Sequence, residues 1–209
     1  MGHVALAAGC LLASAGLHAQ EGPLMIRARA LLIDPTHKSD PIAALAVPAD
    51  AIEVNRRWVP ELDITYFLSK NLATELVLAY TRLDVRVKDS AIGAFDAGSF
   101  RALPPTLLLQ YHFLPDGGIR PYVGAGINYT RISHVRLSVP GVTPLYLDKS
   151  SVGAALQAGV DVKLGGPWYL NVDLKKVWIE SDVKDGAGTR LSTVKLDPVL
   201  FGIGIGYRF

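Results

Sequence analysis

The sequence predicts an all-β protein, an eight-stranded antiparallel transmembrane β-barrel with short periplasmic turns and longer extracellular loops. The segment Val199–Phe209 alternates large apolar residues with small or polar ones, which is typical of a strand between lipid and a lumen. Half of the 209 residues are hydrophobic, yet outside the N-terminal leader no apolar run reaches the roughly 20 residues that a membrane helix needs. Turn clusters at Ser69–Asn71, Pro115–Gly118 and Gly165–Pro167 divide the chain into four similar lengths, each with two strand-like runs.

The N-terminal leader is apolar from Val4 to Leu17, and the small residue Ala19 precedes Gln20 and Glu21. This pattern predicts a secretory signal peptide over residues 1–19, followed by a barrel domain over residues 20–209. A buried N-terminal helix is the alternative, and the lack of Lys or Arg before the apolar segment leaves the true translation start open. Cys10 is the only cysteine, so a chain cleaved after Ala19 would have neither a disulfide nor thiol chemistry.

The first four strand-like runs alternate outward apolar residues with inward polar ones. The first covers residues 24–33 and is followed by a long loop, residues 34–55, rich in Pro and Asp. In the second run Pro60 predicts a bulge or weak pairing, because proline donates no ladder hydrogen bond. In chain order, the inward polar residues of these runs are Arg27 and Arg29, then Glu61 and Asp63, then Glu75, and then Thr106, Gln110 and His112.

The last four runs repeat the pattern. In the fifth, Gly124 and Gly126 are predicted to relieve crowding inside a narrow barrel. The sixth, residues 151–163, is the most regular. The seventh slips its frame at Lys175–Lys176, which predicts a bulge, and the eighth slips at Asp197–Pro198. The inward polar residues of these runs include Asn128, Thr130, Gln157, Asp161, Lys163, Asn171, Asp173, Lys175 and Arg208.

Aromatic residues favour a membrane barrel over a soluble β-sandwich, which would alternate in the same way. They fall on the apolar face and mostly near strand ends, which is typical of the girdles at membrane interfaces. The residues concerned are Trp58, Tyr66, Tyr80, Tyr111, Tyr129, Trp168 and Tyr207. The aromatic ending, Tyr207 and Phe209, predicts an assembly signal for the barrel-assembly machinery.

The ionisable residues on the lumen side carry both signs. They are Arg27, Arg29, Glu61, Asp63, Glu75, His112, Asp161, Lys163, Asp173, Lys175 and Arg208. One interpretation is that paired charges satisfy one another in a lumen just wide enough for side chains. Another is that these pairs form a gate between an outer vestibule and the periplasm. The two interpretations are compatible.

Several short motifs resemble the outer membrane protein W (OmpW) family. The most specific is Arg120-Pro-Tyr-Val-Gly-Ala-Gly-Ile-Asn-Tyr-Thr130, and the others, in chain order, are Met25–Ala28, Leu103–Thr106, Gly159–Asp161, Leu196–Pro198 and Gly206–Phe209. The resemblance implies an eight-stranded barrel in the outer membrane of a Gram-negative bacterium, with a narrow, partly apolar lumen linked to passage of small hydrophobic molecules. Val152 and Val199 stand where the family often has Trp, which puts girdle contacts rather than the fold in doubt.

Apolar residues in the first two extracellular loops support a conduit for small hydrophobic ligands. Ile42, Leu45 and Val47, together with Ile92 and Phe95, are predicted to line a vestibule, because exposed loops seldom carry so many apolar groups. Packing against one another as a plug, or a short helix, is the alternative. A solute that met the charged lumen would leave sideways into the outer leaflet, near Pro60 or Pro104–Pro105. A structural or receptor barrel without transport remains open.

Enzymatic chemistry is not predicted, and neither is a cofactor. The sequence shows no nucleotide loop, metal-ligand spacing or nucleophile elbow, and a net charge of +2 is too small to imply nucleic acid. An outer-membrane lipid-modifying enzyme would have to use Ser133 and His134, which are adjacent on a strand and have no evident carboxylate partner. The expected partners are outer-membrane lipids and lipopolysaccharide, whose phosphates could pair with a basic extracellular rim; ordinary loop solubility is the other explanation for that rim.

Overall fold

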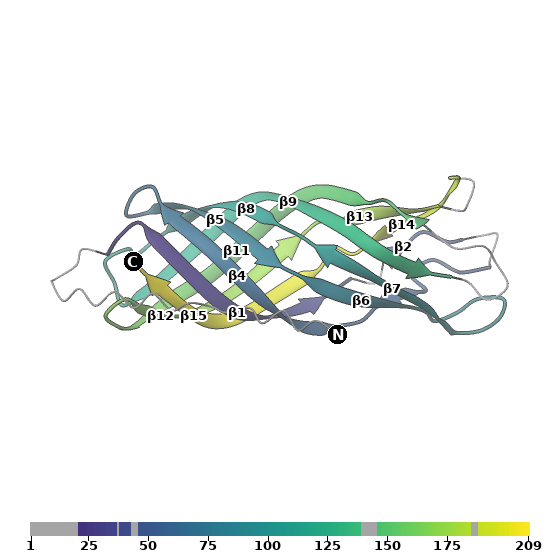
Figure 1. Ribbon diagram of the computed structural model, residues 1–209, viewed down its shortest axis with the longest axis horizontal. Helices are drawn as coiled ribbons and strands as arrows, with labels where there is room; N and C mark the ends of the chain where they lie inside the picture. Colours follow the sequence, from purple (N-terminus) through teal and green to yellow (C-terminus); the bar gives the residue numbers. More distant parts are fainter. Residues whose placement is uncertain (1–20, 37, 43–45, 139–145, 185–187) are drawn as a thin grey trace, which may run out of the picture.

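The computed structural model describes residues 21–36, 38–42, 46–138, 146–184 and 188–209, and the predicted signal peptide lies outside them. The described chain is a long β-barrel whose strands are tilted relative to the barrel axis (Figure 1). No helix in this part of the chain is long and apolar enough to cross a membrane. The strands are β1 (Leu24–Asp34), β2 (Lys38–Ser39), β3 (Ile52–Val54), β4 (Arg57–Phe67), β5 (Leu72–Ala79), β6 (Thr81–Val87), β7 (Phe95–Leu103), β8 (Thr106–His112), β9 (Ile119–Leu137), β10 (Tyr146–Leu147), β11 (Ser150–Gly165), β12 (Trp168–Val177), β13 (Glu180–Lys184), β14 (Arg190–Lys195) and β15 (Val199–Arg208).

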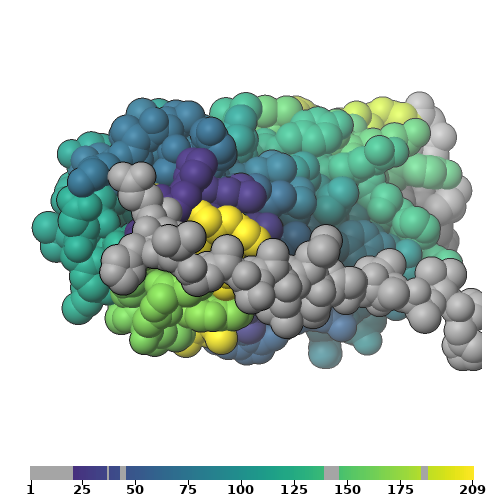
Figure 2. Space-filling model, turned by 60° about the vertical axis from the view of Figure 1, so that its left-hand side comes forward, coloured from purple at the N-terminus to yellow at the C-terminus, as the bar shows by residue number. Residues whose placement is uncertain are grey.

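Eight antiparallel strands form the closed barrel, in the order β1, β4, β5, β8, β9, β11, β12 and β15. β15 pairs with β1 from Met25↔Arg208 to Asp34↔Val199, which closes the sheet. Figure 2 shows this seam as the yellow C-terminal strand beside the purple first strand. The predicted fold class is therefore confirmed. A closed sheet has no unpaired edge, which is the condition for crossing a bilayer with strands.

The predicted inside–outside frame is also confirmed. On β1, for example, Arg27 and Arg29 are buried while Ala28 and Ala30 are exposed. The narrow lumen needs glycine where backbones approach closely. A Cβ atom on Gly126 would lie 1.9 Å from the carbonyl oxygen of Leu107 on the neighbouring strand, so no other residue fits there without a shift of the backbone.

Of two local predictions about strand regularity, the bulge at Lys175–Lys176 is wrong and the irregularity at Pro60 is confirmed in part. β12 pairs without a register shift through Lys175 and Lys176, because Lys176 stays on the outward face, where its Nζ donates to the carbonyl oxygen of Asp197. Pro60 forms no bulge and pairs with Ala30 of β1, but the ladder to β5 begins only at the next residue, so the predicted weak pairing is found on the β5 side. The predicted slip at Asp197 is confirmed, since Asp197 has a φ of 31° and lies between β14 and β15.

The extracellular part contains strands where long loops were expected. β9 extends beyond the barrel and pairs with β7, followed by β6 and β3, while β10, β13, β14 and β2 form a second sheet. β6 shows why, since Leu83, Val85 and Val87 are buried and Arg82 and Arg86 are exposed. The alternation that forms a strand therefore continues above the membrane, but with charged residues in place of apolar ones on the outer face.

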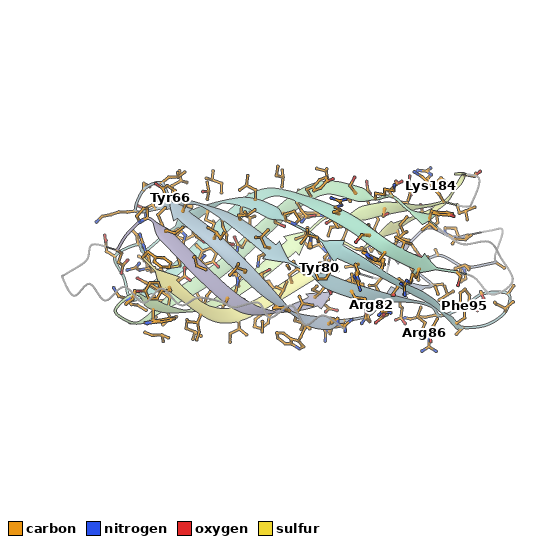
Figure 3. All side chains as sticks on the ribbon, in the orientation of Figure 1. Tyr66, Tyr80, Arg82, Arg86, Phe95 and Lys184 are labelled. Carbon is orange, nitrogen blue, oxygen red and sulfur yellow. The ribbon has the colours of Figure 1, made fainter. Side chains whose placement is uncertain are left out.

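Outward aromatic side chains mark the two membrane interfaces. Figure 3 shows Tyr66 near the end with the short turns and Tyr80 about halfway along the molecule, and both side chains are about half exposed. Arg82, Arg86 and Phe95 follow Tyr80 toward the opposite end. In bacterial outer-membrane barrels the end with short turns faces the periplasm. The membrane-spanning part thus lies between Tyr66 and Tyr80, and the upper sheets stand above it.

Candidate functional site

The interior of the barrel is built in layers because successive inward residues of each strand change character together. On β1 the inward series is Met25, Arg27, Arg29, Leu31 and Ile33, which runs from apolar to charged and back to apolar. On β12 the series Tyr169, Asn171, Asp173, Lys175 and Val177 follows the same order. Four layers result, from the periplasmic mouth to the extracellular end.

The first layer is a cluster around Glu21, which precedes β1 at the periplasmic mouth. Arg120 donates to both carboxylate oxygens at 2.6 and 3.1 Å, and Tyr169 Oη donates at 2.5 Å. Lys163 Nζ and Arg208 Nη1 contact the same carboxylate at 2.5 and 3.1 Å. Burial alone would raise the pKa of Glu21, but the hydrogen bonds from Arg120, Lys163 and Tyr169 outweigh it and lower the pKa to about 2.

This cluster contains two of the predicted lumen charges, at the periplasmic end of the barrel. Lys163 and Arg208 lie at the mouth and hold Glu21, because they are the last inward positions of β11 and β15, beyond the charged centre of the barrel. The alternation of the strands could not reveal the partner itself, because Glu21 lies before the first strand begins.

The second layer is a small apolar cluster that seals the lumen above the mouth. Met25, Phe67, Ala73 and Tyr169 are buried together. The guanidinium of Arg208 lies 3.9 Å from the centre of the Phe67 ring, and His112 lies 5.0 Å from the same ring, centre to centre. His112, a predicted lumen residue, therefore packs between this layer and the next, where its Nε2 lies 3.2 Å from Gln110 Oε1.

The third layer holds the central charges. Arg27 binds Asp161 through two nitrogens, at 2.6 and 3.1 Å, and Glu75 through a third at 2.6 Å. These side chains are fully buried or nearly so. This arrangement is a bidentate guanidinium–carboxylate pair with a second carboxylate on the free nitrogen, which is the geometry that makes buried pairs favourable.

Arg29 and Lys175 join the remaining carboxylates to this layer. Arg29 Nε lies 2.6 Å from Asp63 and 2.9 Å from Glu61, and Lys175 Nζ lies 3.0 Å from Glu61 and 2.5 Å from Asp173. Neutral groups fill the gaps between the charges. Gln157 Nε2, for instance, donates to Glu75 at 2.8 Å and to Asp173 at 2.7 Å. Arg27, Arg29, Glu61, Asp63, Glu75, Asp161, Asp173 and Lys175 thus form one connected network that fills the lumen.

The fourth layer is an apolar chamber in the extracellular half. A cavity of about 60 Å³ lies between the two upper sheets, and its walls come from opposite sides, such as Val54 of β3, Val85 of β6 and Val183 of β13. A second cavity of about 50 Å³ lies below it, down to Glu61 of the charged layer, and the two share Leu196. All the residues that line the upper cavity are apolar except Ser181.

The predicted vestibule residues fall in three places. Ile42, Val47 and Phe95 line the upper cavity. Ile92 is 59% exposed in a turn and does not line it, because the β6–β7 hairpin extends past the chamber and carries its tip into solvent. Leu45 lies outside the described residues. Most of the lining, including Val85 and Val183, belongs to strands that were expected to be loops, although the alternation in β6 was a usable signal.

The wall of the lower cavity contains an interruption of the barrel ladder. The β5–β8 ladder ends at Val77↔Thr106, and the β6–β7 ladder resumes at Thr81↔Ala102. Tyr80, Pro104 and Pro105 lie between these ladders and belong to no strand. Ala79, Thr81, Ala102, Pro104 and Thr106 all line the lower cavity, so the interruption borders this cavity.

Ser133 and His134 lie on β9 above the aromatic residues. Their side chains approach within 3.3 Å, from Nδ1 to Oγ, because His134 has a φ of 48° that breaks the alternation expected of neighbouring strand residues. No ion pair of His134 with a carboxylate is present in the described part of the chain. Across the same residues, no group of His, Cys, Asp and Glu side chains is arranged to hold a metal ion.

Comparison with known proteins gives a consistent assignment. Residues 20–209 match the OmpW family. The chain is 38% identical to outer-membrane protein y4mB of Sinorhizobium fredii, over 94% of this chain and 84% of that protein. It is 32% identical to outer membrane protein W of Escherichia coli, over 98% and 97% of the two chains. The chain is also 31% identical to the dibenzothiophene metabolism operon protein PahQ of Pseudomonas aeruginosa, over 54% of this chain and 53% of PahQ.

A solved structure agrees with the sequence relatives. The outer membrane protein OprG from Pseudomonas aeruginosa superposes with a TM-score of 0.77 at 26% identity, covering 90% of this chain and 96% of that one. Barrel closure, lumen charges and apolar chamber are thus combined in a chain that matches two named outer-membrane proteins, y4mB and outer membrane protein W, over most of their length. The protein is an outer-membrane β-barrel and belongs to the OmpW family.

Proposed function

We propose that the barrel provides a route for small hydrophobic molecules across the outer membrane. The observation that carries this proposal is the apolar chamber, which has a charged floor and an interrupted side wall. The transfer of an apolar solute from water into such a chamber is favourable, by about 25 cal/mol for each Å² of apolar surface buried. The solute gains nothing by moving on into the paired charges below, because their desolvation is costly.

The name of one relative supports the class of solute. Dibenzothiophene is an apolar polycyclic aromatic compound, and PahQ is named as a protein of its metabolism operon. Apart from Ser181, the upper cavity is lined by aliphatic residues and Phe residues, which suit such a solute. The upper cavity has a volume of about 60 Å³, which is too small for a solute of this size, so the two upper sheets must separate during uptake. Separation is feasible because no strand ladder joins β2 to β3 in the described chain.

The route then leads sideways. Tyr80 and Leu103 face outward at the interruption between the β5–β8 and β6–β7 ladders, and their side chains are 54% and 40% exposed. A solute in the lower cavity would therefore reach the lipid side between Tyr80 and Pro104 without crossing the charged layer. Proline lowers the cost of opening there, because Pro104 and Pro105 have no N–H group whose hydrogen bond would have to break.

The test compares the chamber with the charged floor. Ile42→Ser combined with Val47→Ser should slow uptake of a fluorescent hydrophobic probe into protein-containing liposomes, because the two changes make the chamber polar. Ile92→Ser, which alters an equally apolar but exposed residue of a neighbouring loop, serves as the matched control and should leave uptake unchanged. Heat-modifiable migration on gels confirms that each variant is folded.

Glu61→Gln combined with Asp63→Asn should affect uptake much less than the chamber variant. Loss of uptake in the carboxylate variant, with normal uptake in the chamber variant, would place transport down the lumen and refute the lateral route. Equal uptake by liposomes with and without the wild-type protein would favour a structural or receptor barrel instead.

A further inference from the structure

An arginine cluster lies on the outer wall of the barrel, on three strands that are neighbours in the sheet. Its members are Arg82 of β6, Arg101 of β7, and Arg131 and Arg136 of β9. Arg82 and Arg101 are direct partners across the β6–β7 ladder, and Arg101 pairs with Ser133 across the β7–β9 ladder. Arg82, Arg101, His134 and Arg136 line one crevice of about 30 Å³.

The cluster lies directly above the outward apolar band. Arg82 and Arg131 each follow an outward tyrosine, Tyr80 or Tyr129, by two residues on the same face. On β7 Arg101 stands two residues from the outward Leu103, which pairs with Arg131. Two strand residues span about 6.6 Å. Figure 3 shows the order from Tyr80, just before β6, through Arg82 to Arg86 of β6, away from the membrane-spanning part.

The positive charge of the cluster is poorly compensated within the protein. Arg101, Arg131 and Arg136 have no ion pair with any described residue, and all are exposed. Arg82 has only a long contact with Asp84, at 3.6 Å, and Asp84 is shared with Arg57 at 3.8 Å. Like charges directly opposite each other in a ladder repel. An arrangement such as Arg82 opposite Arg101 is therefore suited to an anion that binds both.

The position of the cluster selects the anion. The chain is an outer-membrane protein, and the level just above an aromatic girdle is the level of lipid head groups. In the outer leaflet these head groups belong to lipopolysaccharide, whose lipid A carries phosphates on a glucosamine pair. Guanidinium groups bind phosphate through paired hydrogen bonds, and the hydrocarbon below would lie against Tyr80, Leu103 and Tyr129. We infer that the arginine cluster is a binding site for the phosphate groups of lipid A.

Local geometry prepares the site for this ligand. Arg82 Nε donates to Ser99 Oγ at 3.1 Å, which holds its guanidinium over the crevice. An open hollow of about 680 Å³ continues the crevice upward, and its charged lining residues are Arg56, Arg82, Arg86 and Arg136 together with Glu53, Asp84 and Asp96. The sugar of the same lipid, which forms hydrogen bonds with groups of either charge, would extend into this hollow, beside the interruption in the barrel wall.

The test measures binding of purified lipid A by native mass spectrometry of the folded protein released from detergent micelles. One variant carries Arg82→Gln, Arg101→Gln, Arg131→Gln and Arg136→Gln. The control removes as many positive charges from the second upper sheet and its flanks, with Lys38→Gln, Lys149→Gln, Lys184→Gln and Arg190→Gln. The arginine variant should bind lipid A with both phosphates at least about tenfold more weakly than the wild type, because charge-assisted hydrogen bonds are lost. The control should stay within about twofold of the wild type.

Two further arms identify the ligand. Lipid A without phosphates should bind wild type and arginine variant equally weakly, and inorganic phosphate should compete only at much higher concentration than the lipid. Equal binding of lipid A by wild type and arginine variant would overturn the assignment. Competition by inorganic phosphate at the same concentration as lipid A would overturn it as well, because the site would then bind any phosphate. All these residues are on the surface, and heat-modifiable migration shows that the variants are folded.

Discussion

At the residue scale, Arg27 shows how the charged layer contributes to stability. It is fully buried and satisfies Asp161 and Glu75 at the same time. Arg27→Ala removes the guanidinium partner of buried Asp161 and leaves Glu75 only the longer ion-pair contact with Arg29, at 3.4 Å, so we expect a loss of about 3–5 kcal/mol in the free energy of unfolding. Reversible unfolding in lipid vesicles measures it. Arg57→Ala is the control, because Arg57 is exposed and lies 3.8 Å from Asp84, and it should cost about 1 kcal/mol or less. Similar costs for the two variants would contradict the network.

Glu21 makes the stability of the periplasmic mouth depend on pH. Its pKa in the folded protein is about 2, below the ordinary 4.5, so its contribution is fully present above pH 4.5 and disappears as pH falls toward 2. We expect wild type to exceed Glu21→Gln in free energy of unfolding by about 1–2 kcal/mol at pH 6, a modest value because solvent reaches the cluster. The difference should vanish near pH 2. The comparison with Glu21→Gln cancels the titration of the other carboxylates, and a difference that persists at pH 2 would disprove the explanation.

At the scale of single elements, β11 allows a test of depth in the membrane. Leu156 and Val152 both face outward on this strand, and Val152 pairs with the girdle residue Tyr129. Leu156→Arg should cost about 2–4 kcal/mol because the charge enters the hydrocarbon, whereas Val152→Arg should cost about 0–1 kcal/mol near the interface. Unfolding of both variants in the same lipid vesicles gives the comparison. A larger cost at Val152 would mean that the membrane position is misplaced.

β15 ends in the predicted assembly signal. Phe209 N donates to Leu24 O at 2.9 Å, and its ring packs on Tyr207 with 4.8 Å between centres. Deletion of Phe209 removes the last hydrogen bond of the closing seam, so we expect a smaller folded fraction in cells and more protein in the periplasm. The heat-modifiable band on gels reports the folded fraction. Phe113→Ala, which removes an outward aromatic residue outside the seam, should leave it nearly unchanged; an unaffected Phe209 deletion would exclude the signal.

The same elements show how far sequence alone could lead. Alternation predicted which residues of β1, β4 and β12 face the lumen, because lipid and lumen demand opposite side chains at every second position. It could not predict which charges pair. Arg27 binds Asp161, which is 134 residues away in the sequence. The two residues meet only because of the order of the strands around the barrel. The upper strands were missed because charged outward residues such as Arg82 and Arg86 resemble loop residues.

At the scale of the whole molecule, the layers predict selective permeability. The lumen is filled at two successive levels, by the apolar cluster around Phe67 and by the charged network around Arg27. Neither leaves a water-filled path, since an eight-stranded barrel is only wide enough for its own side chains. Liposomes containing the wild-type protein should therefore not swell in sucrose, whereas the proposed function requires that they take up an apolar probe through the chamber above.

Substitution of neutral lumen residues should open a water-filled path without removing either partner of an ion pair. Tyr122 occupies the space beside Gly159, where an added Cβ atom would lie 2.5 Å from its Oη, and Gln157 stands between Glu75 and Asp173. Tyr122→Gly combined with Gln157→Gly should let water reach the charges and produce measurable swelling in sucrose. Tyr111→Gly, on the outward face, should not. Because water can solvate ions that apolar side chains cannot, this variant should lose some stability but keep its fold. Swelling by the wild type at a comparable rate would show that a polar channel already exists, and the separation of an apolar route from a closed lumen would then be wrong.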